Sequence, residues 1–192
     1  MILNVHRLRQ ERLEKGLSKT ASTIISESAS ARPDTKWDVF LSYSSLDKQA
    51  LPEVVYRIRQ EGLSVYVDRL ADADLDPNNV TAETAARIRG RLQNSSALFV
   101  LTSHNSSASR WVPWELGFAD GAGKHVAVLP IIKSAHADAF RFDGNEYLGL
   151  YPWIDEADDP QHDSRLWPTD PSDPNRYQEL KAWLAGKPLV PH

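Results

Sequence analysis

Between Trp37 and Ile132, short apolar runs alternate with stretches of helical periodicity, and this alternation restricts the fold more than any other feature of the sequence. The apolar runs are predicted as strands over Trp37–Tyr43, Leu63–Val67, Ala97–Thr102 and His125–Ile132. The stretches between them are predicted as helices over Asp47–Glu61, Thr81–Asn94 and about Arg110 to Asp120. Strands that alternate with helices form βαβ units, so the pattern predicts a parallel sheet with helices on both faces.

The C-terminal part of the chain extends this pattern by one strand. A fifth strand is predicted over Tyr147–Ile154, followed by an acidic Pro/Asp-rich loop over residues 155–175 and a closing helix over Tyr177–Leu184. About five strands in this length indicate an α/β, flavodoxin-like, doubly wound parallel sheet. In such sheets ligands bind beyond the carboxyl ends of the strands, so residues 42–47, 68–79, 102–115 and 130–138 become the candidates for a site.

The first 35 residues differ in character from the rest. Residues 1–36 hold seven Lys/Arg against four Asp/Glu, a balance of +3, while residues 37–192 hold 15 against 22, a balance of −7. Apolar residues from Ile2 to Leu17 predict an amphipathic helix over residues 2–16, and the Ser/Thr/Ala-rich residues 18–35 are predicted as a linker. We expect the helix to pack on the domain or on a partner rather than on a membrane.

The composition excludes several classes of site. The chain of 192 residues has no cysteine, which excludes disulfides, thiolate metal sites and cysteine nucleophiles. A net charge of −4 gives no basic footprint for nucleic acid, and the longest apolar runs are too short for a membrane span, so a cytoplasmic protein is expected. The six histidines form no H-x-x-x-H pair, so no histidine metal site is predicted. The G-x-S-x-G motif of ordinary serine hydrolases is absent, and no complete phosphate loop is present.

Two segments at the predicted carboxyl edge carry chemistry. The first is Ser42–Asp47, at the end of the first strand, and the second is Trp111–Glu115, near the start of the helix that follows the third strand. On a helix, Trp111 and Glu115 lie four residues apart and share a face. This spacing places an aromatic plane beside one carboxylate.

Both segments resemble the motifs of Toll/interleukin-1 receptor (TIR) domains. The run Asp38–Tyr43 with Asp47 is similar to the first box of that family, and Trp111–Glu115 matches the W-x-x-x-E pattern of its NAD⁺-cleaving members. The resemblance covers about residues 36–154. It implies a TIR domain over residues 36–192 that includes the acidic loop and the closing helix, preceded by the N-terminal helix and linker of residues 1–35.

The resemblance also implies a function. Glu115 matches the catalytic glutamate of the family, and the residues implied to bind substrate are Ser42, Tyr43, Ser44, Asp68 and Trp111. The implied reaction is cleavage of the nicotinamide–ribose bond of NAD⁺, which is the substrate, with no cofactor and no metal. Bacterial relatives of the Thoeris type imply an ADP-ribose-derived signal for a separate effector, or depletion of NAD⁺, in anti-phage defence. The family's TIR–TIR contacts imply self-association.

The residues are consistent with that chemistry. Breaking the nicotinamide–ribose bond develops positive charge on the sugar, which a fixed carboxylate can stabilise. Nicotinamide leaves as a neutral base, so one glutamate suffices without a second acid. Two alternatives stay open at this point: a non-catalytic TIR interaction module, and another nucleoside or nucleotide glycosidase on a similar fold.

Overall fold

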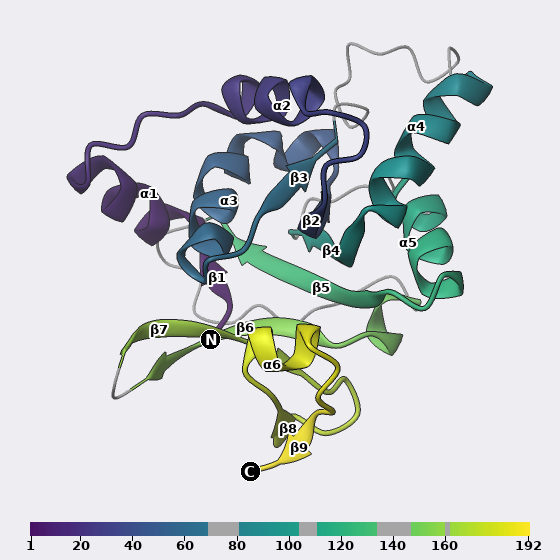
Figure 1. Cartoon of the computed structure of the whole chain (residues 1–192). Helices are drawn as coiled ribbons and strands as arrows, with labels where there is room; N and C mark the ends of the chain where they lie inside the picture. The colour runs from purple at the N-terminus through teal and green to yellow at the C-terminus, as the bar shows by residue number, and fades with distance from the viewer. Residues whose placement is uncertain (69–80, 104–110, 134–146, 160–161) are drawn as a thin grey trace.

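The computed structural model describes residues 1–68, 81–103, 111–133, 147–159 and 162–192. Its centre is a parallel sheet in the order β3-β2-β4-β5-β6 (Figure 1). These strands span Val65–Val67 (β3), Trp37–Ser42 (β2), Ser95–Thr102 (β4), His125–Ile132 (β5) and Trp153–Asp159 (β6). The predicted doubly wound α/β fold is therefore confirmed.

Helices cover both faces of this sheet, and each face has its own apolar core. One face carries α1 (Val5–Glu14), α2 (Ala21–Ser30) and α3 (Leu51–Gln60), with the short helix η1 (Ser45–Ala50) leading into α3. The other face carries α4 (Ala82–Gln93), α5 (Trp111–Gly121) and the turn η2 (Leu148–Leu150). Because side chains alternate along a strand, β2 sends Val39 and Leu41 to the first core and Phe40 to the second.

The segment predicted as a linker contains a helix, so that part of the secondary-structure prediction is wrong. Helix α2 begins after Thr20, whose side chain accepts a hydrogen bond from the Thr23 backbone, and it buries Ile24, Ile25 and Ser28. The Ser28 hydroxyl accepts a hydrogen bond from the Val67 backbone at 3.1 Å, which attaches α2 to β3. Short polar residues disfavour an isolated helix, but contact with the sheet stabilises this one.

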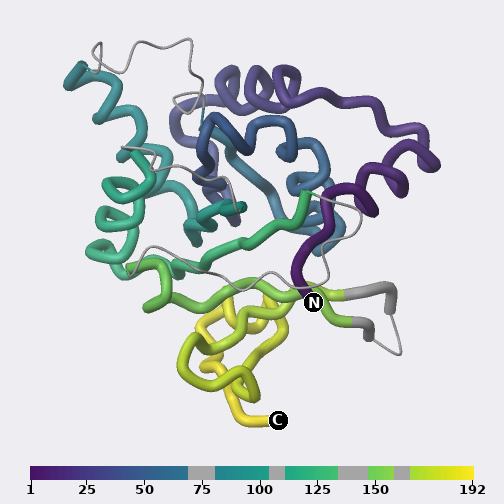
Figure 2. The backbone as a smooth tube through the Cα atoms, turned by 180° about the vertical axis from the view of Figure 1, so that it is seen from behind, coloured from purple at the N-terminus to yellow at the C-terminus, as the bar shows by residue number. Residues whose placement is uncertain are grey.

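The N-terminal helix buries a different face from the one that its predicted apolar stripe indicates. Leu13 and Leu17 are 67% and 44% exposed, whereas Arg12 is buried and pairs with Glu53 of α3 at 2.7 Å. Before α1, strand β1 (Leu3–Asn4) pairs in parallel with Ile131 and Ile132 of β5. Met1 exchanges backbone hydrogen bonds of 2.6 and 2.7 Å with Glu156 of β6, so the N-terminal residues lie between β5 and β6 (Figure 2).

The prediction of an acidic loop over residues 155–175 is wrong as well, because strands β6 and β7 (His162–Thr169) pair there as a hairpin. The two strands are antiparallel, and the sheet continues through β8 (Arg176–Tyr177) and β9 (Val190–Pro191). The closing helix is present but short, as α6 over Leu180–Leu184. Within the part of the chain that the structure describes, no helix combines the length and the apolar character that crossing a membrane requires.

Candidate active site

The site lies at the carboxyl end of β2, where the order of the strands in the sheet reverses. Strand β2 has β3 on one side and β4 on the other, so the connection from β2 to β3 and the connection from β4 to β5 run in opposite directions along the sheet. Doubly wound sheets bind ligands at such a switch point. Ser42 is the last residue of β2 and pairs with Val100 of β4.

Glu115 reaches this point from α5. It lies about one turn into the helix and is only 4% exposed. The Ser42 hydroxyl donates a hydrogen bond of 2.5 Å to Glu115 Oε2. Because Ser42 follows Phe40 at strand spacing, its side chain points to the same face as the core beneath α4 and α5. The structure therefore brings together a serine and a glutamate that are 73 residues apart in sequence.

The surroundings favour the protonated form of this carboxyl. Burial raises the pKa of Glu115, the negative charge of Asp68 raises it further, and the Ser42 hydrogen bond lowers it, with a result of about 8. A buried carboxyl with a strongly perturbed pKa, at a place where ligands bind, is a feature of catalytic sites.

Asp68 directly follows β3 and is 4% exposed. Tyr66 of β3 donates a hydrogen bond of 3.2 Å from its hydroxyl to Asp68 Oδ1. Burial, followed by the charge of Asp68, raises the pKa of Tyr66 well above its usual range, so the phenol keeps its proton for this bond. Tyr66 was not among the predicted site residues, because an aromatic residue within an apolar run predicts only core packing.

Trp111 lies on α5 one turn before Glu115 and is partly buried against the second core. Its ring contacts Trp114 edge to face, with centroids 5.5 Å apart, and Trp114 stacks on Phe118 at 6.0 Å. The Trp114 side of α5 is thus an aromatic row, and Trp114 itself is 37% exposed.

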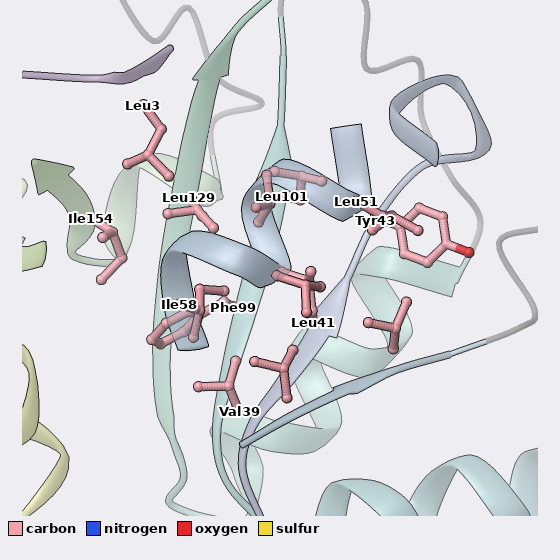
Figure 3. Close-up of a cluster of buried hydrophobic side chains, with 14 of the residues drawn as sticks. Leu3, Val39, Leu41, Tyr43, Leu51, Ile58, Phe99, Leu101, Leu129 and Ile154 are labelled. Carbon is pink, nitrogen blue, oxygen red and sulfur yellow. The ribbon is translucent and has the colours of Figure 1, made fainter. Parts of the chain in front are cut away.

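Two of the predicted substrate residues lie elsewhere. Tyr43 is 2% exposed and packs with Leu41 and Leu51 in the core beneath α3, on the opposite face of the sheet from Ser42 (Figure 3). Ser44 is buried and caps η1, where its hydroxyl accepts a hydrogen bond of 3.4 Å from the Leu46 backbone. Of the candidate segment 68–79, residues 69–79 lie outside the described residues.

A second polar cluster lies at the same edge. Asp47 of η1 is fully buried and accepts a hydrogen bond of 2.7 Å from Ser103, which follows β4. Lys133, which follows β5, places its Nζ 2.6 Å from the same Asp47 oxygen. Asp47 was predicted within the first box, whereas Ser103 and Lys133 were not singled out. Their one signal in the sequence is position, since each directly follows an apolar strand.

Comparison with known proteins agrees with this architecture. The TIR domain family model matches residues 39–166. A relative named "Probable 3' cyclic ADP-D-ribose synthase ThsB'", from Bacillus cereus (strain MSX-D12), is 45% identical over 118 residues, which are 62% of this chain and 60% of that protein. A second, named "Putative cyclic ADP-D-ribose synthase TIR2", from Cytobacillus dafuensis, is 24% identical over 58% of this chain and 30% of its own length.

The chain thus spans less than two thirds of the length of these relatives. Among solved structures, a metazoan TIR-STING receptor from C. gigas in complex with 2',3'-cGAMP matches 56% of this chain and 32% of its own, with 17% identity and a TM-score of 0.34. The family model covers more than half of the chain, from within β2 through β6, and includes the helix that carries Glu115. The chain belongs to the TIR domain family.

Proposed function

We propose that this chain cleaves the nicotinamide–ribose bond of NAD⁺ as a glycohydrolase or cyclase. The observation that carries the proposal is the buried Glu115 carboxyl, held by Ser42 at the switch point of the sheet. A scaffold that only binds partners gains nothing from burying a carboxyl whose ionisation is disfavoured there. Two relatives with names of cyclic ADP-D-ribose synthases support the same reaction.

The geometry suits a reaction in which positive charge develops on the sugar. As the bond from ribose C1′ to the pyridinium nitrogen breaks, its electron pair goes to nicotinamide, which leaves as a neutral base. The carboxylate of Glu115 then stabilises the cationic ribose, and burial strengthens that interaction relative to water. Water or a nucleophile within the same dinucleotide completes the reaction at C1′, which yields ADP-ribose or a cyclic product. The names of the relatives favour the cyclic product.

Incubating concentrated protein with NAD⁺ and analysing the products by chromatography and mass spectrometry tests the proposal. We expect release of nicotinamide that depends on Glu115, with Glu115→Ala as the inactive comparison. The mass of the second product separates hydrolysis from cyclisation, since the cyclic form lacks one water. Cleavage of neutral nucleosides, with NAD⁺ left intact, would replace the proposal with another glycosidase activity. An intact substrate at every protein concentration would favour the interaction module.

The pKa of Glu115 predicts how the rate depends on pH. The acting form is the carboxylate, and a pKa of about 8 leaves most of the group protonated at neutral pH in the empty site. We therefore expect kcat/KM for NAD⁺ to rise with pH and level off above about 8. Ser42→Ala removes the hydrogen bond that lowers this pKa, so the rise should move to higher pH. A rate that falls across this range would contradict the role of Glu115.

We further propose that the product acts as a diffusible signal for a separate effector in bacterial anti-phage defence. A second part of this proposal is that TIR–TIR self-association in the cytoplasm forms the active enzyme. The relatives named as synthases of cyclic ADP-D-ribose support the first part, because such a product suits a messenger. A rate per protein molecule that increases with concentration, measured beside the oligomeric state, would support the second part.

A further inference from the structure

We propose that Lys133 binds the diphosphate of the dinucleotide substrate at the carboxyl edge of β5. This inference rests on the proposed function, because it assigns the anionic part of the same substrate to a second group at the same edge. It begins from the cluster formed by Lys133, Asp47 and Ser103, which the bond-breaking chemistry at Glu115 does not use.

The cluster holds an ammonium in a fixed position. Lys133 Nζ lies 2.6 Å from Asp47 Oδ1 and donates a second hydrogen bond of 2.9 Å to the carbonyl oxygen of Leu46. Asp47 is itself fixed, since it is fully buried and also accepts the Ser103 hydroxyl at 2.7 Å. An ammonium has three N–H donors, so Asp47 and Leu46 leave one for a further acceptor.

The two ends of the ion pair differ in their access to solvent. The Asp47 side chain is 0% exposed, whereas 34% of the Lys133 side chain is exposed. An ion pair that is buried only at its acidic end holds the cation in place and leaves its outer side open to a ligand. A cation held in this way binds a phosphate oxygen favourably, because the lysine side chain loses little conformational entropy on binding.

The position of Lys133 fits a dinucleotide whose reacting end lies at Glu115. Lys133 follows Leu129 and Ile131 at strand spacing, so it belongs to the face of the sheet opposite Ser42 and Glu115. Strands β2 and β5 are separated by β4 alone, which places them roughly 10 Å apart. Dinucleotides bind across the carboxyl edge of doubly wound sheets, and a ligand that crosses this edge passes from Glu115 to Lys133.

The acidic residues at this edge also mean that an anionic ligand needs a cation to bind there. Glu115, Asp68 and Asp47 are acidic and buried. The pyridinium of NAD⁺ suits Asp68 and the ionised form of Glu115, whereas the diphosphate carries two negative charges and would be repelled by these carboxylates. Lys133 supplies the opposite charge at the end of the edge that lies away from Glu115, so the two halves of the substrate meet charges of the correct sign.

Binding of ADP and of adenosine, measured by titration calorimetry, tests this inference without any turnover. We expect Lys133→Gln to weaken ADP binding by about tenfold or more, which is the loss of one charge-assisted hydrogen bond, while adenosine binding changes little. Lys133→Arg should keep most of the ADP affinity, because it keeps the charge. Lys124→Gln is the matched control, since Lys124 precedes β5 at the opposite edge of the sheet and its Nζ bonds to the carbonyl of Gln93.

Equal losses of ADP and adenosine affinity in Lys133→Gln, or no loss of either, would overturn the inference, as would a wild-type protein that does not bind ADP. If Lys133→Gln fails to fold, the salt dependence of binding to the wild-type protein tests the inference. Added salt should weaken ADP binding and leave adenosine binding unchanged. Cleavage of NAD⁺ is assayed separately, so failure of the phosphate contact and failure of the proposed activity give different results.

Discussion

Replacing Glu115 with glutamine is expected to lower the turnover of NAD⁺ by roughly 10²-fold or more and, in the same variant, to raise thermal stability. The amide has nearly the shape of the carboxyl and its carbonyl can still accept the Ser42 hydrogen bond. It carries no negative charge, so it cannot stabilise a cationic ribose. The gain in stability has the same origin, because the native protein holds this acid in a place that disfavours its charge.

The sign of the stability change follows from the pKa of Glu115. That pKa rises from 4.5 to about 8 on folding, so between these values the native state binds more protons than the unfolded state. The contribution of Glu115 to stability is therefore present at low pH and is lost as pH rises through about 8. The advantage of glutamine should grow over the same range, to several kcal/mol at about 1.4 kcal/mol per pKa unit.

Thermal unfolding of wild type and Glu115→Gln at about pH 5 and about pH 9 measures this effect, with roughly 2–4 °C expected for each kcal/mol. The exposed Glu14, at the end of α1, provides the control, since Glu14→Gln removes the same charge without a change in burial. A Glu115→Gln variant that is less stable than wild type at the higher pH would contradict the description of the site as one that penalises the carboxylate.

Replacing Arg57 with methionine is expected to cost about 3–5 kcal/mol of unfolding free energy. Arg57 of α3 is buried and bonds to Glu61 at 2.7 Å and to Glu156 of β6 at 2.8 Å. Arg7 of α1 also bonds to Glu156, and Glu61 accepts the Leu166 backbone of β7 at 3.0 Å. Without Arg57, the two carboxylates lose their shared cation in a region with little access to water.

Urea unfolding measures this loss, and two variants interpret it. Lys19→Met breaks an exposed ion pair with Glu27, whose side chains are 54% and 42% exposed, and should cost less than about 1 kcal/mol. Adding Glu61→Gln to Arg57→Met should recover part of the loss, because the double variant no longer holds a buried carboxylate at position 61 without its arginine partner. If Arg57→Met is no more costly than Lys19→Met, the network does not join α1, α3 and the hairpin as described.

The parallel strands β2 to β5 follow from the sequence because they are largely continuous apolar runs, which a sheet covered on both faces requires. Helix α2 was missed because its buried side, Ile24, Ile25 and Ser28, is short and lies among Ser and Thr. The hairpin was missed because a buried position of β6 is occupied by Glu156. A charge at a core position hides the strand pattern, and that charge is tolerated because the distant Arg57 and Arg7 both pair with it.

The site divides in the same way. The family motifs in the sequence include Ser42 and Glu115, and their contact follows from the end of one strand and the start of one helix meeting at a single edge. The cluster around Asp47 depends on how separate strands and η1 meet, and the bond from Tyr66 to Asp68 depends on the direction of two side chains at the end of one strand. Periodicity does not specify contacts between separate elements, so no pattern in the sequence could have paired Lys133 with Asp47.

The N-terminal residues that lie between β5 and β6 have a consequence for the order in which the chain folds. Leu3 and Asn4 pair with residues 131 and 132, and Met1 with residue 156, so these residues leave the ribosome long before the partners that they pair with. Contacts over such separations are slow to form, since the intervening chain must be ordered first. During synthesis α1 can meet α3 early, but β1 takes its place only after β5 has emerged.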